Sequence, residues 1–238
     1  MDAQTRSALK KDDVFIHGTQ VGLDWIAENR GTAIRIVVAA VVAIAIIVAG
    51  VILYQHHSEV AENAFGRAAA VYATPLADAS QPMPPGVKTF PTAADRAKAA
   101  NPLFEDAAKG YSHTTAGRNA LYFAGLTAAE MGDTAKAQAD FKKASEFHDA
   151  NIASLARLAL ANLLAQHGQT NEAIQQYQEL IKHPTTTVPA ATAQLQLAAL
   201  YEANHNTAEA NKIYALLKAK DTTTAAGQIA AQKLAGKH

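Results

Sequence analysis

The strongest pattern in the chain is an unbroken apolar run from residue 36 to residue 53, which Ile34 and Tyr54 extend. A bilayer core about 30 Å thick requires about 20 apolar residues in a helix that rises about 1.5 Å per residue. A buried core helix fits less well because the run has no polar face. A cleaved signal peptide fits less well because its apolar core spans only about 7–15 residues. We therefore expect a transmembrane helix over residues 33–54.

The charges that flank this run are asymmetric. The first basic residue after it is Arg67, whereas five basic residues precede its apolar core: Arg6, Lys10, Lys11, Arg30 and Arg35. Basic residues concentrate on the cytoplasmic side of membrane proteins. The pattern predicts a single-pass protein with residues 1–32 as a cytoplasmic tail and the C-terminal part on the far side. In a bacterium the membrane would be the inner membrane, and the far side would be the periplasm.

Residues 55–100 are expected to form a juxtamembrane helix and a proline-rich linker. Val60, Ala64, Ala68 and Tyr72 recur every four residues, which predicts that the helix continues to about residue 73. Prolines between residues 75 and 91 predict a loop. Helical signals return at Thr92, and Asn101-Pro102 has the form of a second helix start, so we expect a helix from residue 102 to about residue 110.

From residue 114 onward the chain repeats a helix–turn–helix pattern. The turns fall at residues 132, 168 and 205, where Gly or Asn would accommodate a positive φ. A small residue in the first helix should allow the second helix to approach closely, and a second-helix aromatic should pack toward the next repeat. The three repeats supply, in that order, Gly125 and Phe141, Ala161 and Tyr177, and Ala198 and Tyr214.

Composition supports helices and excludes several functions. The chain has no cysteine, 6% aromatic residues, and 21 basic against 21 acidic residues, so it carries no basic footprint for nucleic acid. Metalloprotease, serine-hydrolase and nucleotide-binding motifs are absent from the sequence. We therefore expect an all-α protein that is not an enzyme, with no cofactor, no metal and no small-molecule substrate.

The spacing resembles the tetratricopeptide repeat, a helix–turn–helix unit of about 34 residues. The match covers roughly residues 114–220, and a helix over about residues 224–236 would cap the stack. The large aromatic that the family places near the start of the first helix is missing and is replaced by Leu121, Arg157 and Gln194. The resemblance implies a tetratricopeptide-like α-solenoid over residues 101–238, following the single N-terminal transmembrane helix.

The layout as a whole looks like the YfgM-like ancillary subunit of the Sec translocon. The shared features are the segment Trp25–Arg30 before a single span, and the small residues Ala61, Ala64, Ala68 and Ala69 after it. This resemblance implies a periplasmic interaction scaffold that acts as an adaptor or chaperone partner at the translocon. Its partners would be translocon subunits, a periplasmic chaperone or emerging polypeptides. The alternative is an assembly factor of another cell-envelope complex, for secretion or outer-membrane assembly.

The positions that usually line the binding groove of tetratricopeptide repeats supply the candidate protein-binding residues. This face is mixed apolar and polar and lacks a Lys and Arg set that would clamp a carboxylate, so an apolar segment of a partner is the expected ligand. Each residue singly is about as well explained by packing against neighbouring helices. The candidates are Asn119, Tyr122, Leu126, Leu158, Asn162, Gln166, Leu195 and Glu202.

Overall fold

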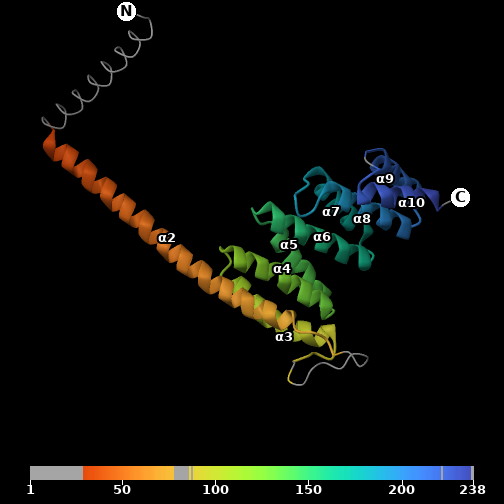
Figure 1. The fold of residues 1–238 in the computed structure, drawn as a ribbon, viewed down its shortest axis with the longest axis horizontal. Coiled ribbons are helices and arrows are strands. Elements are labelled where there is room, and N and C mark those ends of the chain that lie inside the picture. The colour runs from red at the N-terminus through yellow and green to blue at the C-terminus, as the bar shows by residue number, and fades with distance from the viewer. Residues whose placement is uncertain (1–28, 78–85, 87, 221, 237–238) are drawn as a thin grey trace, which may run out of the picture. The chain divides into compact units, whose positions relative to one another are not determined.

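A computed structural model describes residues 29–77, 86, 88–220 and 222–236 (Figure 1). All regular elements within these residues are helices, and the one β-bridge is isolated, between Leu76 and Phe90. The prediction of an all-α protein is therefore confirmed. The helices are α2 (Arg30–Tyr72), α3 (Ala93–Gly110), α4 (Thr115–Glu130), α5 (Thr134–Ser145), α6 (Ala150–Gln166), α7 (Thr170–Lys182), α8 (Ala190–Ala203), α9 (Thr207–Lys220) and α10 (Ala225–Ala235).

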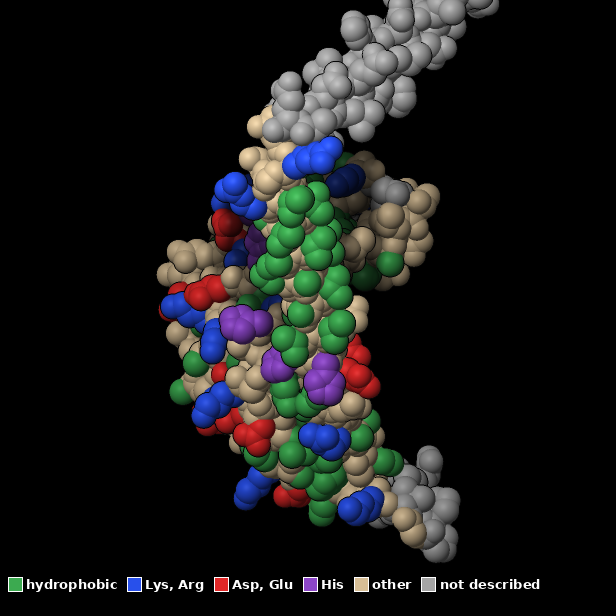
Figure 2. Space-filling view, turned by 90° about the vertical axis from the view of Figure 1, so that its left-hand side faces the viewer, with side chains coloured by type: hydrophobic (Ala, Val, Ile, Leu, Met, Phe, Trp, Pro, Cys, Tyr) green, Lys and Arg blue, Asp and Glu red, His purple; other side chains and the backbone are tan. Residues whose placement is uncertain are grey.

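The chain divides into two compact units, Met1–His56 and His57–His238, which are described separately. In the first unit, α2 carries large apolar side chains that are all about half exposed or more, from Ile34 to Tyr54. Figure 2 shows hydrophobic side chains gathered in a column that no acidic or basic side chain interrupts. The predicted helix is thus long and apolar enough to cross a membrane. Residues 1–28 of the predicted cytoplasmic tail lie outside the described residues.

In the second unit, the last four or so turns of α2 pack against α3 and α4. Ala61 and Ala68 are fully buried, whereas Val60, which shares the four-residue spacing of Ala64 and Ala68, is 39% exposed. Four aromatic rings form the centre of this contact, and the stacked pair Phe104 and Phe123 has centroids 5.2 Å apart. The other two rings belong to Phe65 and Tyr72 of α2. This segment of α2 is therefore part of the helical stack.

Helix α3 corrects one prediction. It begins after Thr92, whose side chain accepts a hydrogen bond from the Asp95 amide, and it continues through Pro102. The expected helix start at residue 102 is wrong. Asn101 does not act as a cap but is 5% exposed, and its Nδ2 donates to the Ala124 carbonyl and to Thr127 Oγ1 of α4. These two hydrogen bonds to another helix, at about 1 kcal/mol each, offset much of the roughly 3 kcal/mol that an internal proline costs.

The predicted loop between α2 and α3 is closed at its base. The Ala77 amide donates to the Phe90 carbonyl at 2.8 Å, and the Phe90 amide donates to the Pro75 carbonyl at 3.0 Å. Most of the proline-rich segment between them, residues 78–85 and 87, lies outside the described residues. The two bonds hold the end of α2 and the start of α3 together, so these helices form a hairpin.

The three predicted turns are confirmed. Gly132, Gly168 and His205 have φ angles of 81°, 73° and 59°. In each case the next amide donates to a carbonyl five residues earlier, for example Asp133 to Ala128 at 2.9 Å, which is the Schellman ending of an α-helix. The sequence pattern favoured Gly or Asn at positive φ, but in the third turn a histidine adopts it.

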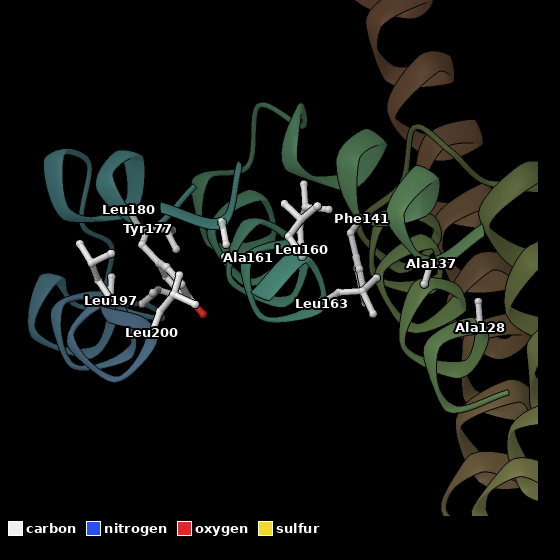
Figure 3. Packing of buried hydrophobic residues seen from close by; sticks show 14 residues of the cluster. Ala128, Ala137, Phe141, Leu160, Ala161, Leu163, Tyr177, Leu180, Leu197 and Leu200 are labelled. Atoms are coloured by element: carbon white, nitrogen blue, oxygen red, sulfur yellow. The ribbon is translucent and has the colours of Figure 1, made fainter. Parts of the chain in front are cut away.

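The close approach of paired helices is also confirmed. A Cβ built on Gly125 would lie 2.7 Å from Cε1 of Phe141, so any side chain at this point of the α4–α5 contact would require the Phe141 ring to move. The equivalent Ala161 and Ala198 are fully buried. Figure 3 shows the core side chains between successive helices, with Phe141, Leu160 and Leu163 close together. A continuous apolar core therefore runs from α4 to α8.

Polar contacts link successive turns at one edge of the stack. Thr134 Oγ1 lies 3.1 Å from His167 Nε2, and Thr170 Oγ1 lies 3.2 Å from Asn204 Oδ1. Both pairs join the first residue of a second helix to the residue that ends the first helix of the next repeat. A contact between a threonine hydroxyl and a polar side chain of the next repeat therefore recurs at equivalent positions.

Candidate protein-binding groove

A hollow of about 260 Å³ lies between α4 and α6, and Phe141 of α5 contributes to its wall. Five of the eight candidates line it: Tyr122, Leu126, Leu158, Asn162 and Gln166. The remaining lining residues are Ala129, Phe141, Leu155, Ala159 and Leu163. We call this hollow the α4–α6 groove.

Helical periodicity places these side chains together. Tyr122, Leu126 and Ala129 are separated by four and three residues, so they share one face of α4. Leu158, Asn162 and Gln166 are each four residues apart and share one face of α6. The two faces border the same hollow.

The α4–α6 groove is apolar and carries no charged side chain. Its polar groups are the Tyr122 hydroxyl and the amides of Asn162 and Gln166. Tyr177 donates a hydrogen bond to Asn162 Oδ1 at 2.6 Å, and burial raises the pKa of Tyr177 to about 12. The Tyr177 hydroxyl therefore stays a donor, which orients the Asn162 amide and leaves its NH₂ group without a partner among the described residues.

The other three candidates lie outside the hollow. Leu195 packs against the core cluster of α8, α9 and α10. Glu202 accepts hydrogen bonds from Tyr214 at 3.1 Å and from Lys233 at 2.9 Å, so it takes part in a network that joins α8 to α9 and α10. Asn119 is partly buried, and its Oδ1 has no hydrogen-bond partner among the described residues. The described contacts thus give Leu195 and Glu202 roles in packing.

Sequence reasoning missed five lining residues. Leu155 lies about one helical turn before Leu158, and Ala159 lies next to Leu158. Extending the three- and four-residue spacing of the candidates along α6 would have found both residues. Phe141 was expected to pack toward the next repeat, and it does so by contributing to a hollow that α6 also lines. No sequence signal indicated that the hollow remains unfilled, because that depends on the distance between α4 and α6.

Comparison with known proteins identifies the repeat family. A family model described as a tetratricopeptide repeat-like domain matches residues 24–180, which is more than half of the chain. The match includes the apolar helix and both helices that line the groove, while α8, α9 and α10 lie beyond it. The search of curated proteins found no match, and neither did the search of solved structures. This chain therefore belongs to the tetratricopeptide repeat-like domain family, whose repeats typically serve as non-enzymatic modules for protein–protein interaction.

Proposed function

We propose that this protein is a membrane-anchored periplasmic scaffold that binds an apolar segment of a partner protein in the α4–α6 groove, as an adaptor or chaperone partner at the Sec translocon. The observation that carries the proposal is the groove itself, an uncharged hollow of about 260 Å³ on a repeat domain. A charged or nucleic-acid ligand would leave its charges unpaired there, which is costly.

The dimensions and chemistry of the groove define the ligand. A hollow of about 260 Å³ accepts one large apolar side chain with part of its main chain. Full burial of a Leu or Phe side chain contributes about 1.5–3 kcal/mol. The unpaired NH₂ group of Asn162 is placed to donate to a main-chain carbonyl of the same segment. The contact is weak on its own, so it suits transient binding of chains that the anchor brings close.

The apolar helix and its flanking charges support the location. Arg30 and Arg35 lie at the N-terminal end of α2, whereas the first basic residue after the apolar segment is Arg67. The family model matches residues 24–180, a range that includes this helix. The assignment to the translocon rests on the sequence resemblance around Trp25–Arg30.

Photocrosslinking in cells tests the proposal. A photoreactive amino acid replaces Leu158 in the groove, or Gln175 on the exposed face of α7 as the matched control. Adducts from position 158 to translocon subunits, a periplasmic chaperone or secreted chains, with none from position 175, are the expected result. Adducts confined to another envelope complex would replace the translocon with that complex. Equal adducts from both positions would contradict binding in the groove.

A charge placed in the groove provides a second test. Leu158→Asp should reduce recovery of the crosslinked partners at least tenfold, because a carboxylate would be desolvated against the apolar ligand. Gln175→Asp should leave recovery unchanged because this position is exposed. Unchanged recovery with Leu158→Asp would refute the groove as the binding site.

A further inference from the structure

The second helices of the hairpins, α3, α5, α7 and α9, share one buried pattern. Each carries an aromatic residue that is at most 2% exposed, with a buried Ala or Leu three positions later. The aromatics lie 36 or 37 residues apart: Phe104, Phe141, Tyr177 and Tyr214. They therefore define equivalent positions in the four helices, including α3, which precedes the three repeats that the sequence predicted.

The outward positions of α9 differ from those of the other three helices. One, two and five residues after the aromatic, α3, α5 and α7 carry only charged or amide side chains. In that order they are Glu105, Asp106 and Lys109, then Lys142, Lys143 and Glu146, then Gln178, Glu179 and Lys182. In α9 the three positions hold Ala215, Leu216 and Ala219, all exposed. At 56%, Leu216 is more exposed than any other large apolar side chain described in the second unit.

The hollow between α3 and α5 shows what these positions face in the rest of the stack. Asp106 and Lys109 of α3 line it together with Gly117 and Leu121 of α4 and with side chains of α5. The outward positions of one second helix and a face of the next first helix therefore border the second helix that follows. In α9 these positions are apolar although terminal repeats usually present a polar outer face.

Helix α10 occupies the position of the next first helix. Ala230 of α10 lies in one core cluster with Tyr214 of α9. Ala120 of α4 lies in the equivalent cluster with Phe104 of α3. Both alanines are fully buried. The two first helices can therefore be aligned with residue 230 on residue 120.

One face of α9 and α10 is left uncovered. In α4, Leu121 shares a core cluster with α5, and Gly125 lies against the Phe141 ring. The aligned residues of α10 are both alanine, and among the described residues no helix follows α10 (Figure 1). We call this face the terminal seat, and its residues are Ala215, Leu216, Ala219, Ala231 and Ala235.

The terminal seat is flanked by an excess of basic side chains. The charged residues that the structure describes in α9 and α10 are Lys212, Lys218, Lys220, Lys233 and Glu209. Lys212 pairs with Glu209 at 2.6 Å, and Lys233 pairs with Glu202 of α8 at 2.9 Å. The other two lysines have no ion-pair partner among the described residues. Residues 221 and 237, an aspartate and a lysine, lie outside the described residues.

We propose that the terminal seat binds an amphipathic helix of a partner protein, with an apolar face and acidic flanks. Its apolar face would take the place of a further second helix, and the small Ala231 and Ala235 would permit the close approach that Gly125 permits to Phe141. Acidic flanks would pair with the free lysines, whereas a second copy of this face would oppose like charges. This surface is distinct from the α4–α6 groove, so the proposal does not depend on the function proposed above.

Two synthetic peptides that copy Thr170–Lys182 of α7 serve as probes, because α7 already fits between two first helices of this stack. One carries Gln175→Glu and Gln178→Glu, and the other carries Gln175→Lys and Gln178→Lys. Glu and Lys have similar helix propensities, so the cost of forming the helix cancels in the comparison. Fluorescence anisotropy of each labelled peptide is followed as the full chain is added in neutral detergent. The acidic peptide should bind about fivefold more tightly than the basic one, and 0.5 M salt should reduce this preference.

Substitutions locate the binding. Leu216→Gln should weaken binding of the acidic peptide about tenfold, because the leucine would be buried under it. Ile229→Gln is the matched control: Ile229 is 43% exposed, but it lies about 200° around α10 from Ala231, so binding should not change. Lys218→Glu together with Lys220→Glu should reverse the preference between the two peptides.

Several results would overturn the proposal. These are equal binding of both peptides, no saturable binding of either, or equal losses with Leu216→Gln and Ile229→Gln. A dimer that Leu216→Gln dissociates, seen by analytical ultracentrifugation, would make a second copy the occupant instead of a partner. Leu158→Asp in the α4–α6 groove should leave peptide binding unchanged, so failure here and failure of the groove proposal are distinguishable. If a variant does not fold, the comparison of the two peptides on the unsubstituted chain still decides.

Discussion

Gly117→Ala should destabilise the protein although it places alanine in a helix. Gly117 lies in the first turn of α4, beneath the tight loop that follows α3. A Cβ at this position would lie 1.9 Å from the carbonyl oxygen of Tyr111 and 2.4 Å from its carbonyl carbon. Both atoms belong to the backbone, so no change of side-chain rotamer can relieve the clash and the loop must move by more than 1 Å or so.

The hydrogen bonds that the loop would lose set the magnitude. The Tyr111 carbonyl accepts from the Thr114 amide at 2.9 Å and from Thr114 Oγ1 at 2.8 Å. Thr114 Oγ1 in turn caps α4 by accepting from the Gly117 amide at 3.0 Å. Each bond contributes about 1 kcal/mol, as does the cap. Alanine regains about 1 kcal/mol of helix propensity, which leaves a net loss of about 2 kcal/mol.

Gly66→Ala is the matched control, because Gly66 is exposed in α2 and a Cβ there would meet no atom within 4 Å. It should stabilise by about 0.5–1 kcal/mol. Thermal unfolding of the full chain in detergent, followed by far-UV circular dichroism, should show Tm about 4–8 °C lower for Gly117→Ala and about 2–3 °C higher for Gly66→Ala. If both substitutions raise Tm by similar amounts, the steric argument is refuted.

Three further predictions follow from the same stack. Gly125→Ala should lower stability by about 1 kcal/mol, and Phe141→Leu in the same chain should make that substitution neutral or favourable, as a double-mutant cycle in urea would show. Burial raises the pKa of Tyr177 to about 12, whereas a tyrosine in the unfolded chain titrates near 10. The free energy of unfolding should therefore fall as the pH rises from 10 to 12. Tyr177→Phe should reduce this dependence on pH and free the Asn162 amide. His205→Gly should raise Tm by about 2–3 °C by relieving the positive φ; an unchanged or lower Tm would argue against strain there.

The repeats were predictable because their determinants are local in the sequence. A turn residue, a small residue in the first helix and an aromatic in the second recur with almost fixed spacing, and each acts within its own hairpin. The apolar run was predictable for a similar reason, since length and hydropathy alone distinguish it. The structure confirmed the turns at Gly132, Gly168 and His205 and the contact between Gly125 and Phe141.

Features that depend on distant contacts were not predictable. Asn101-Pro102 has the local signature of a helix start, but hydrogen bonds from Asn101 to α4 keep α3 continuous. The sequence could not decide whether Leu195 and Glu202 line a binding groove or pack against other helices, because the answer depends on α10, which lies beside both residues in the structure.

The recurring contact between repeats has a consequence for how this protein can change in length. Thr134 contacts His167 of the middle repeat, and Thr170 of the middle repeat contacts Asn204. The middle repeat therefore carries a threonine on one face and, on the other face, a residue that can pair with such a threonine. A duplicated copy of the middle repeat, which consists of α6, α7 and the loop that follows α7, would find matching neighbours on both sides. Because such stacks gain stability from nearest-neighbour interfaces, modular duplication would lengthen the interaction surface without redesign of either end.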